Sequence, residues 1–217
     1  MRQGADSNRE NPGARNPRQR RCADRLVSPF RRVDEFRDHP PRGDYEQARA
    51  TWCHGGSAQG YTPAPRLAGQ RRIYIEQQLA SFASRTRDAP FSKQYMWGAA
   101  ANLRPWESHA LSVYFSNLPP RAADDGEREL VALGETIYQR GMPDANIAAC
   151  VACHGPRGEG VGAIPRIGGL AYTYLKRRLE QWTEGYHGTL VHPMPHIAEQ
   201  LSRNQIDELA SYLSFLK

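Results

Sequence analysis

The stretch Cys150-Val151-Ala152-Cys153-His154 decides how this chain of 217 residues is to be understood. Two cysteines that are separated by two residues and followed at once by histidine form the attachment pattern of c-type haem. Each thiol forms a thioether with one haem vinyl group, and the adjoining imidazole binds the iron. The second ring nitrogen of such an imidazole needs an acceptor, for which we expect the backbone carbonyl of Pro165. The motif therefore predicts covalently bound haem.

Cys-x-x-Cys has two other common roles in proteins. The pattern also occurs as half of a zinc site and as a redox-active dithiol. Zinc requires a second Cys/His pair, and none follows Cys153 at a suitable spacing. A thioredoxin-like dithiol belongs to a sheet with crossover helices, whereas no segment of this chain alternates as a convincing strand. Haem is therefore the favoured interpretation.

The chain contains a second, related half about 100 residues earlier. An ordered series of matches runs along both halves, first at a shift of 100 residues and then at a shift of 98, which indicates an internal repeat with a small deletion between 182 and 194. Pairs at the first shift include Cys53 with Cys153, His54 with His154, Pro65-Arg66 with Pro165-Arg166, and Tyr74 with Tyr174. Pairs at the second shift include Met96 with Met194 and Leu111 with Leu209.

Hydrophobic periodicity predicts an all-α protein. Apolar residues recur at helical spacing over 73–82, 127–138, 172–182 and 202–216, and Pro105 suits the first turn of a further helix. Ser202 and Gln205 form a capping box before the last of these helices. Leu118-Pro119-Pro120 is followed by acidic residues and glycine, which predicts a linker. We expect a leader over 1–43, a first domain over 44–118, a linker over 119–125 and a second domain over 126–217.

The sixth iron ligand should come from the segment between the middle and the last helix of each half. In the second half Met194 lies in a proline-stiffened loop, and its partner in the repeat is Met96. A thioether sulfur favours ferrous iron and raises the reduction potential. We therefore predict His154 and Met194 as one axial pair and His54 and Met96 as the other. The rival ligands for the second site are His187, His192 and His196.

The first half departs from the attachment pattern, because Ala50 stands where the second half has Cys150. Three outcomes follow: haem held by Cys53 through a single thioether, haem bound without a covalent bond, or a half that binds no haem. We favour the first, since both predicted axial ligands of this half persist. Cys22 lies in the leader, and we interpret it as an incidental free thiol.

Two arginines and several aromatic residues also repeat. Arg66 and Arg166 follow the paired prolines, where each guanidinium either pairs with a haem propionate or lies in a solvated loop. For the larger aromatic side chains we expect core packing rather than electron relay. These are Trp52, Tyr74, Phe82, Trp106, Tyr174 and Trp182.

The formal net charge of +6 belongs mainly to the N-terminal leader. Residues 1–43 hold 11 arginines and 6 acidic side chains, whereas 44–217 hold 18 basic and 17 acidic side chains. A nucleic-acid-binding protein needs a basic face on a folded body, so we expect no nucleic-acid partner. The polar composition of the leader predicts disorder.

No apolar run approaches the roughly 20 residues of a transmembrane helix, so none is expected. Residues 1–43 also lack the apolar stretch of a secretory signal. Covalent haem attachment nevertheless resembles a process that is completed outside the cytoplasm. We therefore expect a periplasmic protein, and we infer either that a signal is missing from this chain or that its start is wrongly assigned.

Over residues 44–217 the sequence resembles the dihaem cytochromes c of the cytochrome c4 type. The resemblance rests on the two Cys-His-Gly motifs, on Pro-Arg-Leu-Ala-Gly-Gln at 65–70, on both methionines and on Leu-Ala-Ser-Tyr-Leu at 209–213. It implies two tandem class I cytochrome folds that face each other, two His/Met haems, and a periplasmic shuttle toward terminal oxidases.

We therefore expect a one-electron carrier. Its donor would be a dehydrogenase or a bc1-type complex, and its acceptor a terminal oxidase. Filled axial positions leave no site for a substrate, so we do not expect an enzyme. Three alternatives stay open: a cytochrome subunit of a larger dehydrogenase or oxidase complex, a monohaem protein with a degenerate first half, and a dihaem peroxidase with one five-coordinate or switchable haem.

Overall fold

The computed structural model of the chain describes residues 50–186 and 193–217. Within these ranges the regular elements are helical, and two isolated bridges pair Tyr61 with Ala64 and Met142 with Ile147. The all-α prediction is confirmed for this part of the chain. The predicted leader and the rival ligands His187 and His192 lie outside the described residues. Among the described helices, none is long and apolar enough to cross a membrane.

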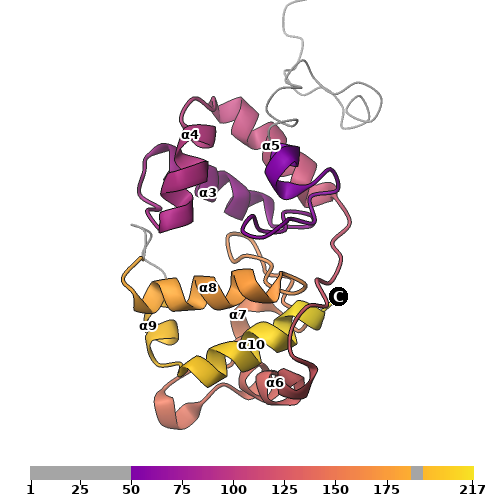
Figure 1. Ribbon diagram of the computed structural model, residues 1–217, viewed down its shortest axis with the longest axis vertical. Coiled ribbons are helices and arrows are strands. Elements are labelled where there is room, and N and C mark those ends of the chain that lie inside the picture. The colour runs from indigo at the N-terminus through magenta and orange to yellow at the C-terminus, as the bar shows by residue number, and fades with distance from the viewer. Residues whose placement is uncertain (1–49, 187–192) are drawn as a thin grey trace, which may run out of the picture. The chain divides into compact units, whose positions relative to one another are not determined.

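The first half is built around α3 (Arg72–Ala83), which packs against α5 (Pro105–Asn117) and α4 (Trp97–Ala100), as Figure 1 shows. A helical turn over 50–54 precedes α3, and the π-helix η2 (Ser92–Met96) leads directly into α4. α5 begins at Pro105, as predicted, and the Glu107 carboxylate accepts a 2.7 Å hydrogen bond from the Arg104 backbone N–H. Proline and this carboxylate fix where the helix starts.

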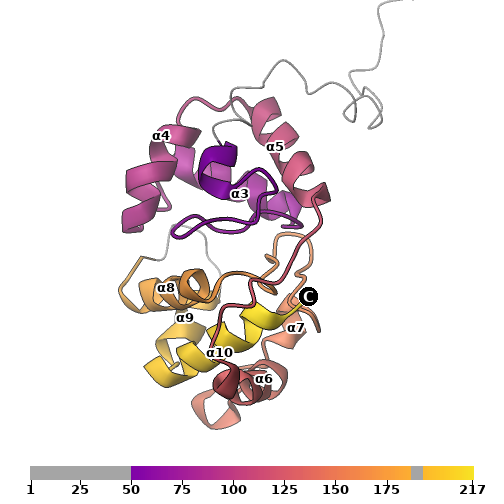
Figure 2. The ribbon, with the colours of Figure 1, turned by 45° about the vertical axis from the view of Figure 1, so that its right-hand side comes forward.

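In the second half, α10 (Arg203–Phe215) packs against α6 (Val131–Arg140) and α8 (Tyr172–Thr183), and α8 also contacts α9 (Met194–Glu199) (Figure 2). Between α6 and α8 lie η4 (Pro143–Ala145) and the short α7 (Val151–His154), and η3 (Arg128–Leu130) precedes α6. The predicted capping box is confirmed, since Ser202 accepts from the Gln205 N–H and the Gln205 side chain accepts from the Ser202 N–H.

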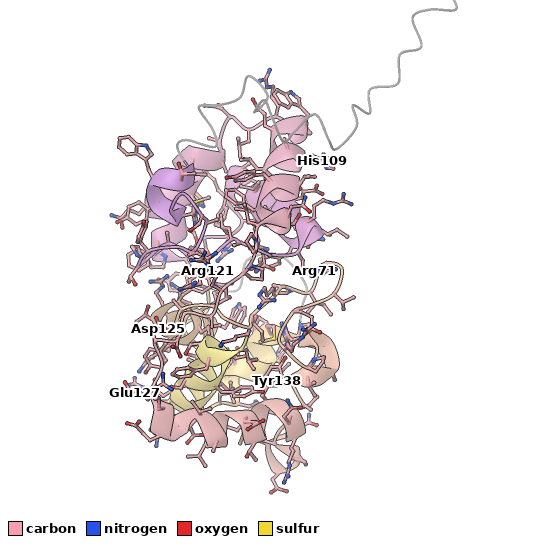
Figure 3. The ribbon with its side chains drawn as sticks, turned by 90° about the vertical axis from the view of Figure 1, so that its right-hand side faces the viewer. Arg71, His109, Arg121, Asp125, Glu127 and Tyr138 are labelled. Atoms are coloured by element: carbon pink, nitrogen blue, oxygen red, sulfur yellow. The ribbon has the colours of Figure 1, made fainter. Side chains whose placement is uncertain are left out.

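The internal repeat is visible in what each half buries. The two hydrophobic cores use equivalent positions: Ile75, Leu111 and Phe115 are buried in the first half, and Leu175, Leu209 and Leu213 are buried in the second. Tyr138 on α6, labelled in Figure 3, is fully buried in the second core. The pair of α3 and α5 in the first half and the pair of α8 and α10 in the second therefore bury equivalent positions, although the side chains differ in size.

The segment that joins the halves is held by hydrogen bonds. The Ala123 N–H donates to the Gly169 carbonyl, and the Asp124 N–H donates to the Ser214 carbonyl. The Asp125 carboxylate accepts a 2.9 Å hydrogen bond from the Tyr172 N–H at the start of α8 (Figure 3). The predicted linker thus follows the surface of the second half, and the domain boundaries given above stay a prediction.

Two local predictions were wrong. Trp52 and Trp106 do not pack in the core, because 86% and 50% of their surface is exposed. Trp106 lies at the outer start of α5, where the Arg104 guanidinium covers its ring at 4.5 Å. Met194 was expected in a loop, whereas it is the first residue of α9, with Pro193 before it and Pro195 in its first turn.

Candidate functional site

One cavity of about 1160 Å³ brings together every side chain that the sequence predicted to hold haem. Small-molecule sites usually measure roughly 300–1,000 Å³, so this cavity lies just above the upper end of that range. The predicted residues that line it are Cys53, His54, Arg66, Met96, Cys150, Cys153, His154, Arg166 and Met194.

In the second half, α7 positions the predicted iron ligand. His154 is 6% exposed, and its Nδ1 donates a 3.1 Å hydrogen bond to the Pro165 carbonyl, as predicted. This bond leaves Nε2 free to bind a metal. Burial lowers the pKa of His154, and the hydrogen bond to Pro165 opposes that effect only in part. The imidazole is therefore neutral near pH 7, which is the form that ligates iron.

The first half repeats this geometry. His54 is 6% exposed, and its Nδ1 donates to the Pro65 carbonyl at 2.7 Å. Burial likewise lowers the pKa of His54, against the opposing effect of that hydrogen bond. Ala50 lies one turn before His54 and lines the cavity, where the second half has Cys150. The first half thus keeps the ligand and its acceptor while one of the two thiols is missing.

A glycine in each half makes the histidine–carbonyl contact possible. Gly60 and Gly160 have φ values of 74° and 67°, and their N–H groups donate to the carbonyls of His54 and His154 at 2.7 and 2.8 Å. A Cβ at Gly60 would lie 2.7 Å from the Ala64 carbonyl oxygen, and one at Gly160 would overlap the Ile164 carbonyl. Only glycine therefore lets the chain turn back so closely to the histidine.

The environment of Cys150 argues against a redox dithiol. Burial raises the pKa of the Cys150 thiol to about 11, whereas reactive Cys-x-x-Cys thiols have pKa values of about 3.5–7.5. Cys53 and Cys153 are exposed at the mouth of the cavity. Within the part of the chain that the structure describes, no cluster of three or more His, Cys, Asp or Glu side chains could hold a metal ion. Zinc is therefore not supported either.

The two predicted methionines enter the cavity from different elements. Met96 is the last residue of η2, and Met194 is the first residue of α9. A π-helix is a rare conformation that occurs frequently at functional sites. The rival His196 does not line the cavity, and its side chain is 88% exposed. Among the described candidates, methionine is thus the side chain available to each site.

Five arginines give the cavity its charge. They are Arg66, Arg87, Arg166, Arg177 and Arg178. No aspartate or glutamate is among the described residues that line it. Three of these guanidinium groups have a buried Nε without a hydrogen-bond partner in the described structure, and Nη2 of Arg166 is equally unpaired. Buried charges require partners, so the lining fits a ligand that carries several negative charges.

The individual arginines support this conclusion. Arg166 is 8% exposed, which does not suit a solvated loop side chain. Burial, and then the neighbouring charge of Arg87, lowers the pKa of Arg178 to about 10. Carboxylates beside these guanidinium groups would offset both the cost of their burial and the repulsion between neighbouring arginines. Each haem carries two such carboxylates, its propionates. The residues present therefore fit haem, because the same lining holds cysteines, histidines and guanidinium groups with unpaired buried N–H groups.

Sequence reasoning missed Arg87, Arg177 and Arg178. A signal was present in the repeat, since Gln77 and Gln78 of the first half are replaced by Arg177 and Arg178 in the second.

Two of these arginines also form hydrogen bonds between the halves. Arg177 Nη2 donates to the Pro63 carbonyl at 2.9 Å, and the Arg87 guanidinium donates to the Tyr174 hydroxyl at 3.4 Å.

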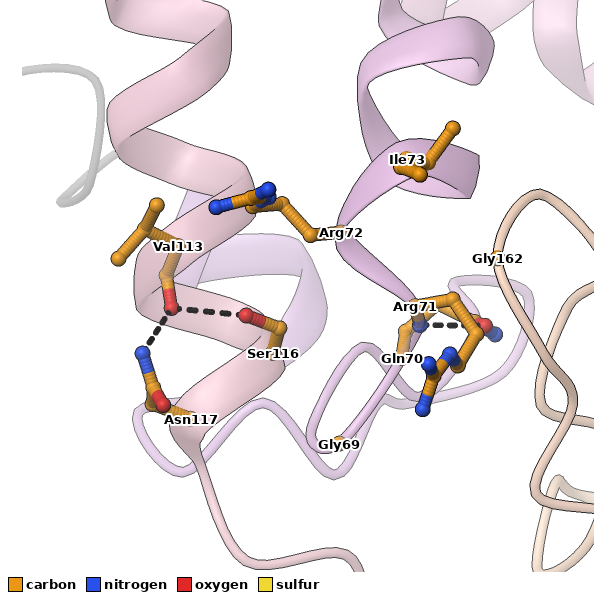
Figure 4. A pocket seen from close by; sticks show the side chains of 9 residues that line it. All are labelled: Gly69, Gln70, Arg71, Arg72, Ile73, Val113, Ser116, Asn117 and Gly162. Carbon is orange, nitrogen blue, oxygen red and sulfur yellow. Dashed lines mark hydrogen bonds between the residues drawn. The ribbon is translucent and has the colours of Figure 1, made fainter.

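A smaller hollow of about 380 Å³ lies at the start of α3 (Figure 4). Its lining includes Arg71, Arg72 and Asn117. No cysteine, histidine or methionine is among the described residues that line it. This hollow is therefore not a haem site.

Comparison with known proteins identifies relatives of this chain. Residues 131–217 match the family described as cytochrome c. Cytochrome c-552 of Acidithiobacillus ferridurans is 34% identical over 168 residues, which cover 76% of this chain and 72% of that protein. The structure of cytochrome c4 from Acidithiobacillus ferrooxidans matches with a TM-score of 0.73 and 32% identity, over 78% of this chain and 99% of that one. This chain belongs to the cytochrome c4 family.

A further relative, the thiosulfate dehydrogenase electron acceptor of Stutzerimonas stutzeri, is 36% identical over 75% of this chain and 76% of its own length. As a member of the cytochrome c4 family, this cytochrome has two class I domains, contains haem c and is a dihaem electron carrier. The expectations of fold, cofactor and function are thereby confirmed.

Proposed function

We propose that the second haem is bound by thioethers to Cys150 and Cys153, with His154 and Met194 as axial ligands. The first is bound by a single thioether to Cys53, with His54 and Met96 as axial ligands. Arg66 and Arg166, together with the three other cavity arginines, pair with the propionates. The domain boundaries are those predicted, 44–118 and 126–217.

The observation that carries this proposal is the cavity with two ligand sets and five arginines. One haem would bring two propionates, whereas two haems bring four. Four carboxylates come closer to balancing five guanidinium groups in a lining without described acidic residues. Two haems therefore explain the charge of the cavity better than one, and a monohaem protein with a degenerate first half would leave most of the cations unpaired.

Haem supplies a one-electron couple between ferrous and ferric iron. The protein residues determine how that couple is used. His54 and His154 remain neutral because they are buried, and the proline carbonyls fix their ring orientation. Met96 and Met194 would each supply a second protein ligand to one iron, which would leave no coordination position for a substrate or oxygen. We therefore propose electron transfer without catalysis, which distinguishes this cytochrome from a dihaem peroxidase.

We further propose a periplasmic shuttle that accepts electrons from a dehydrogenase or bc1-type complex and donates them to a terminal oxidase. The relative named as a thiosulfate dehydrogenase electron acceptor supports a dehydrogenase of sulfur compounds as the donor class. Residues 44–217 are nearly neutral, so docking would be a weak encounter through apolar surface. A steep loss of the transfer rate with added salt would contradict this mode of docking.

The deciding experiment is a pyridine haemochrome spectrum with haem-to-protein stoichiometry on the full chain. Two haems per chain are expected, one of them with the band position of a single-thioether haem. One haem per chain, or two haems that both show two thioethers, would contradict the proposal. Resting protein that binds cyanide or peroxide would favour the peroxidase, and co-purification of a larger complex would favour the subunit alternative.

A further inference from the structure

Gln70 connects the first half of the chain to the second through a buried amide. Its side chain is 5% exposed. Nε2 donates to the Arg166 carbonyl at 2.9 Å, and Oε1 accepts from the Arg166 backbone N–H at 2.7 Å. The same oxygen accepts from the Arg71 N–H at 2.9 Å, as the dashed line in Figure 4 shows. Two backbone donors thus fix the orientation of this carboxamide.

The bond to Arg166 reaches the predicted iron ligand through one planar group. The Arg166 N–H and the Pro165 carbonyl belong to the same peptide unit. That carbonyl accepts the hydrogen bond from His154 Nδ1 at 3.1 Å. A continuous chain therefore runs from Gln70 Oε1 through this peptide to the His154 ring. Hydrogen bonds in such a chain polarise one another, so the Gln70 contact makes the Pro165 carbonyl a stronger acceptor.

Only the first half provides this hydrogen bond to the other half. The repeat aligns Gln70 with Leu170, which is buried and has no polar side-chain atom. The second half therefore cannot return the same contact to the Pro65–Arg66 peptide through this position. Both halves of the repeat keep the buried histidine and the proline carbonyl that accepts its hydrogen bond. They differ at position 70/170, where only the first half has a side chain that can hydrogen-bond to the peptide of the other half.

We propose that Gln70, in the first half, is a positioning residue for the proximal histidine of the second haem. It holds the Pro165–Arg166 peptide and polarises it toward His154. A stronger acceptor at Nδ1 makes the imidazole a better electron donor to the iron, which stabilises the ferric state. Gln70 thus lowers the potential of the second haem relative to the same domain without it. This inference rests on His154 being an axial ligand, as proposed above.

The test uses the full haem-loaded chain and the variant Gln70→Leu, which copies Leu170. We expect the ferrous-to-ferric ratio of the second haem at a fixed applied potential to rise roughly three- to tenfold, or ~30–60 mV for one electron. Spectroelectrochemical titration measures this shift. NMR of ¹⁵N-histidine-labelled protein should show a changed His154 Nδ1–H signal, while His54 serves as the unchanged control within the same molecule.

Two further variants separate positioning from packing. Gln70→Glu keeps an oxygen that can accept from the Arg166 N–H, so the second potential should stay at or below that of the unmodified chain. Gln139→Leu makes the same change as the first variant at an exposed position on α6 and should alter neither haem.

Four results would overturn the inference: an unchanged or lowered second potential in Gln70→Leu, an equal shift of both haems, an unmoved His154 signal, or the same upward shift in Gln70→Glu. A failure of the proposed function would look different. It would show itself in the unmodified chain, as a second haem that is missing or is not ligated by His154, before any substitution is made.

Discussion

At the scale of single residues, the two halves differ most at one thiol. Ala50 and Cys150 occupy equivalent positions, and both line the cavity. The following residues of the motif keep the same arrangement, with an exposed cysteine at the mouth and a buried histidine behind it. On the function proposed above, the missing thiol would therefore change how the first haem is attached, while the side chains proposed to ligate its iron are kept.

Restoring that thiol should restore the second covalent bond. In Ala50→Cys we expect the single-thioether band of the pyridine haemochrome to move to the position of ordinary haem c, with two haems per chain as before. The matched variant Cys150→Ala should produce the opposite change, so that both haems show single-thioether spectra. A spectrum of Ala50→Cys identical to that of the unmodified chain would contradict attachment through Cys53.

The proposed sixth ligand of the second haem is also a single residue, Met194. In Met194→Ala the iron of the second haem should lose its methionine ligand. The long-wavelength charge-transfer band of methionine-ligated ferric haem should then fall by about half, because only one of the two proposed methionine-ligated haems remains. The altered haem should also bind cyanide. Met142→Ala is the control, because Met142 packs against the same core without lining the cavity. A variant at Met194 that keeps the full band would show that another side chain ligates the iron.

At the scale of elements, the core of the second half depends on close packing of α6 against α10. α6 and α10 cross at Gly134, where a Cβ would overlap the backbone carbonyl of Glu208. Because this neighbour is helix backbone, it cannot rotate away as a flexible side chain would. Glycine is present here for close approach, since its own helical conformation would suit alanine better.

Gly134→Ala should therefore destabilise the protein. We expect a loss of about 1–3 kcal/mol in the free energy of unfolding, as for other overpacked sites, measured by guanidinium unfolding of the haem-loaded chain. Gly56→Ala provides the control, because a Cβ there meets nothing within 4 Å. Equal stability of the two variants would show that α6 and α10 can separate without cost.

At the scale of the whole molecule, the cavity gathers cations from both halves. Arg87 comes from the first half and Arg177 and Arg178 from the second, and each lines the same cavity. A buried positive charge near haem disfavours the ferric state, which carries one more positive charge than the ferrous state. These arginines should therefore raise the reduction potentials, although paired propionates reduce the effect.

Removing one of these charges should lower the potentials. A unit charge about 10 Å from the iron, at an effective dielectric constant of about 20, contributes roughly 1–2 kcal/mol. A paired propionate neutralises part of this contribution. We therefore expect Arg178→Leu to lower at least one reduction potential by about 20–60 mV. Arg140→Leu, at the exposed end of α6, should leave both potentials unchanged because solvent screens its charge. Equal effects of the two variants would contradict a buried charge.

The sequence by itself determined the longer helices, the repeat and the two buried histidines that donate to proline carbonyls. Helical periodicity and capping are local, so α5, α8 and α10 begin where Pro105, Tyr172 and Ser202 predicted. The attachment motif and the acceptor carbonyl are also local, since Pro165 comes only eleven positions after His154. Such features depend on neighbours along the chain, and the helix starts and the hydrogen bond to Pro165 were predicted correctly.

Only the tertiary structure decided what the two halves do together. Contacts between residues about 90–100 positions apart, such as Gln70 with Arg166 and Arg87 with Tyr174, leave no periodic signal in the chain. The exposure of Trp52 was equally hidden, because burial depends on which surface the folded chain places beside it. The repeat marks Arg177 and Arg178 as changes from glutamine, but only the packing of distant segments places them in one cavity with Arg87.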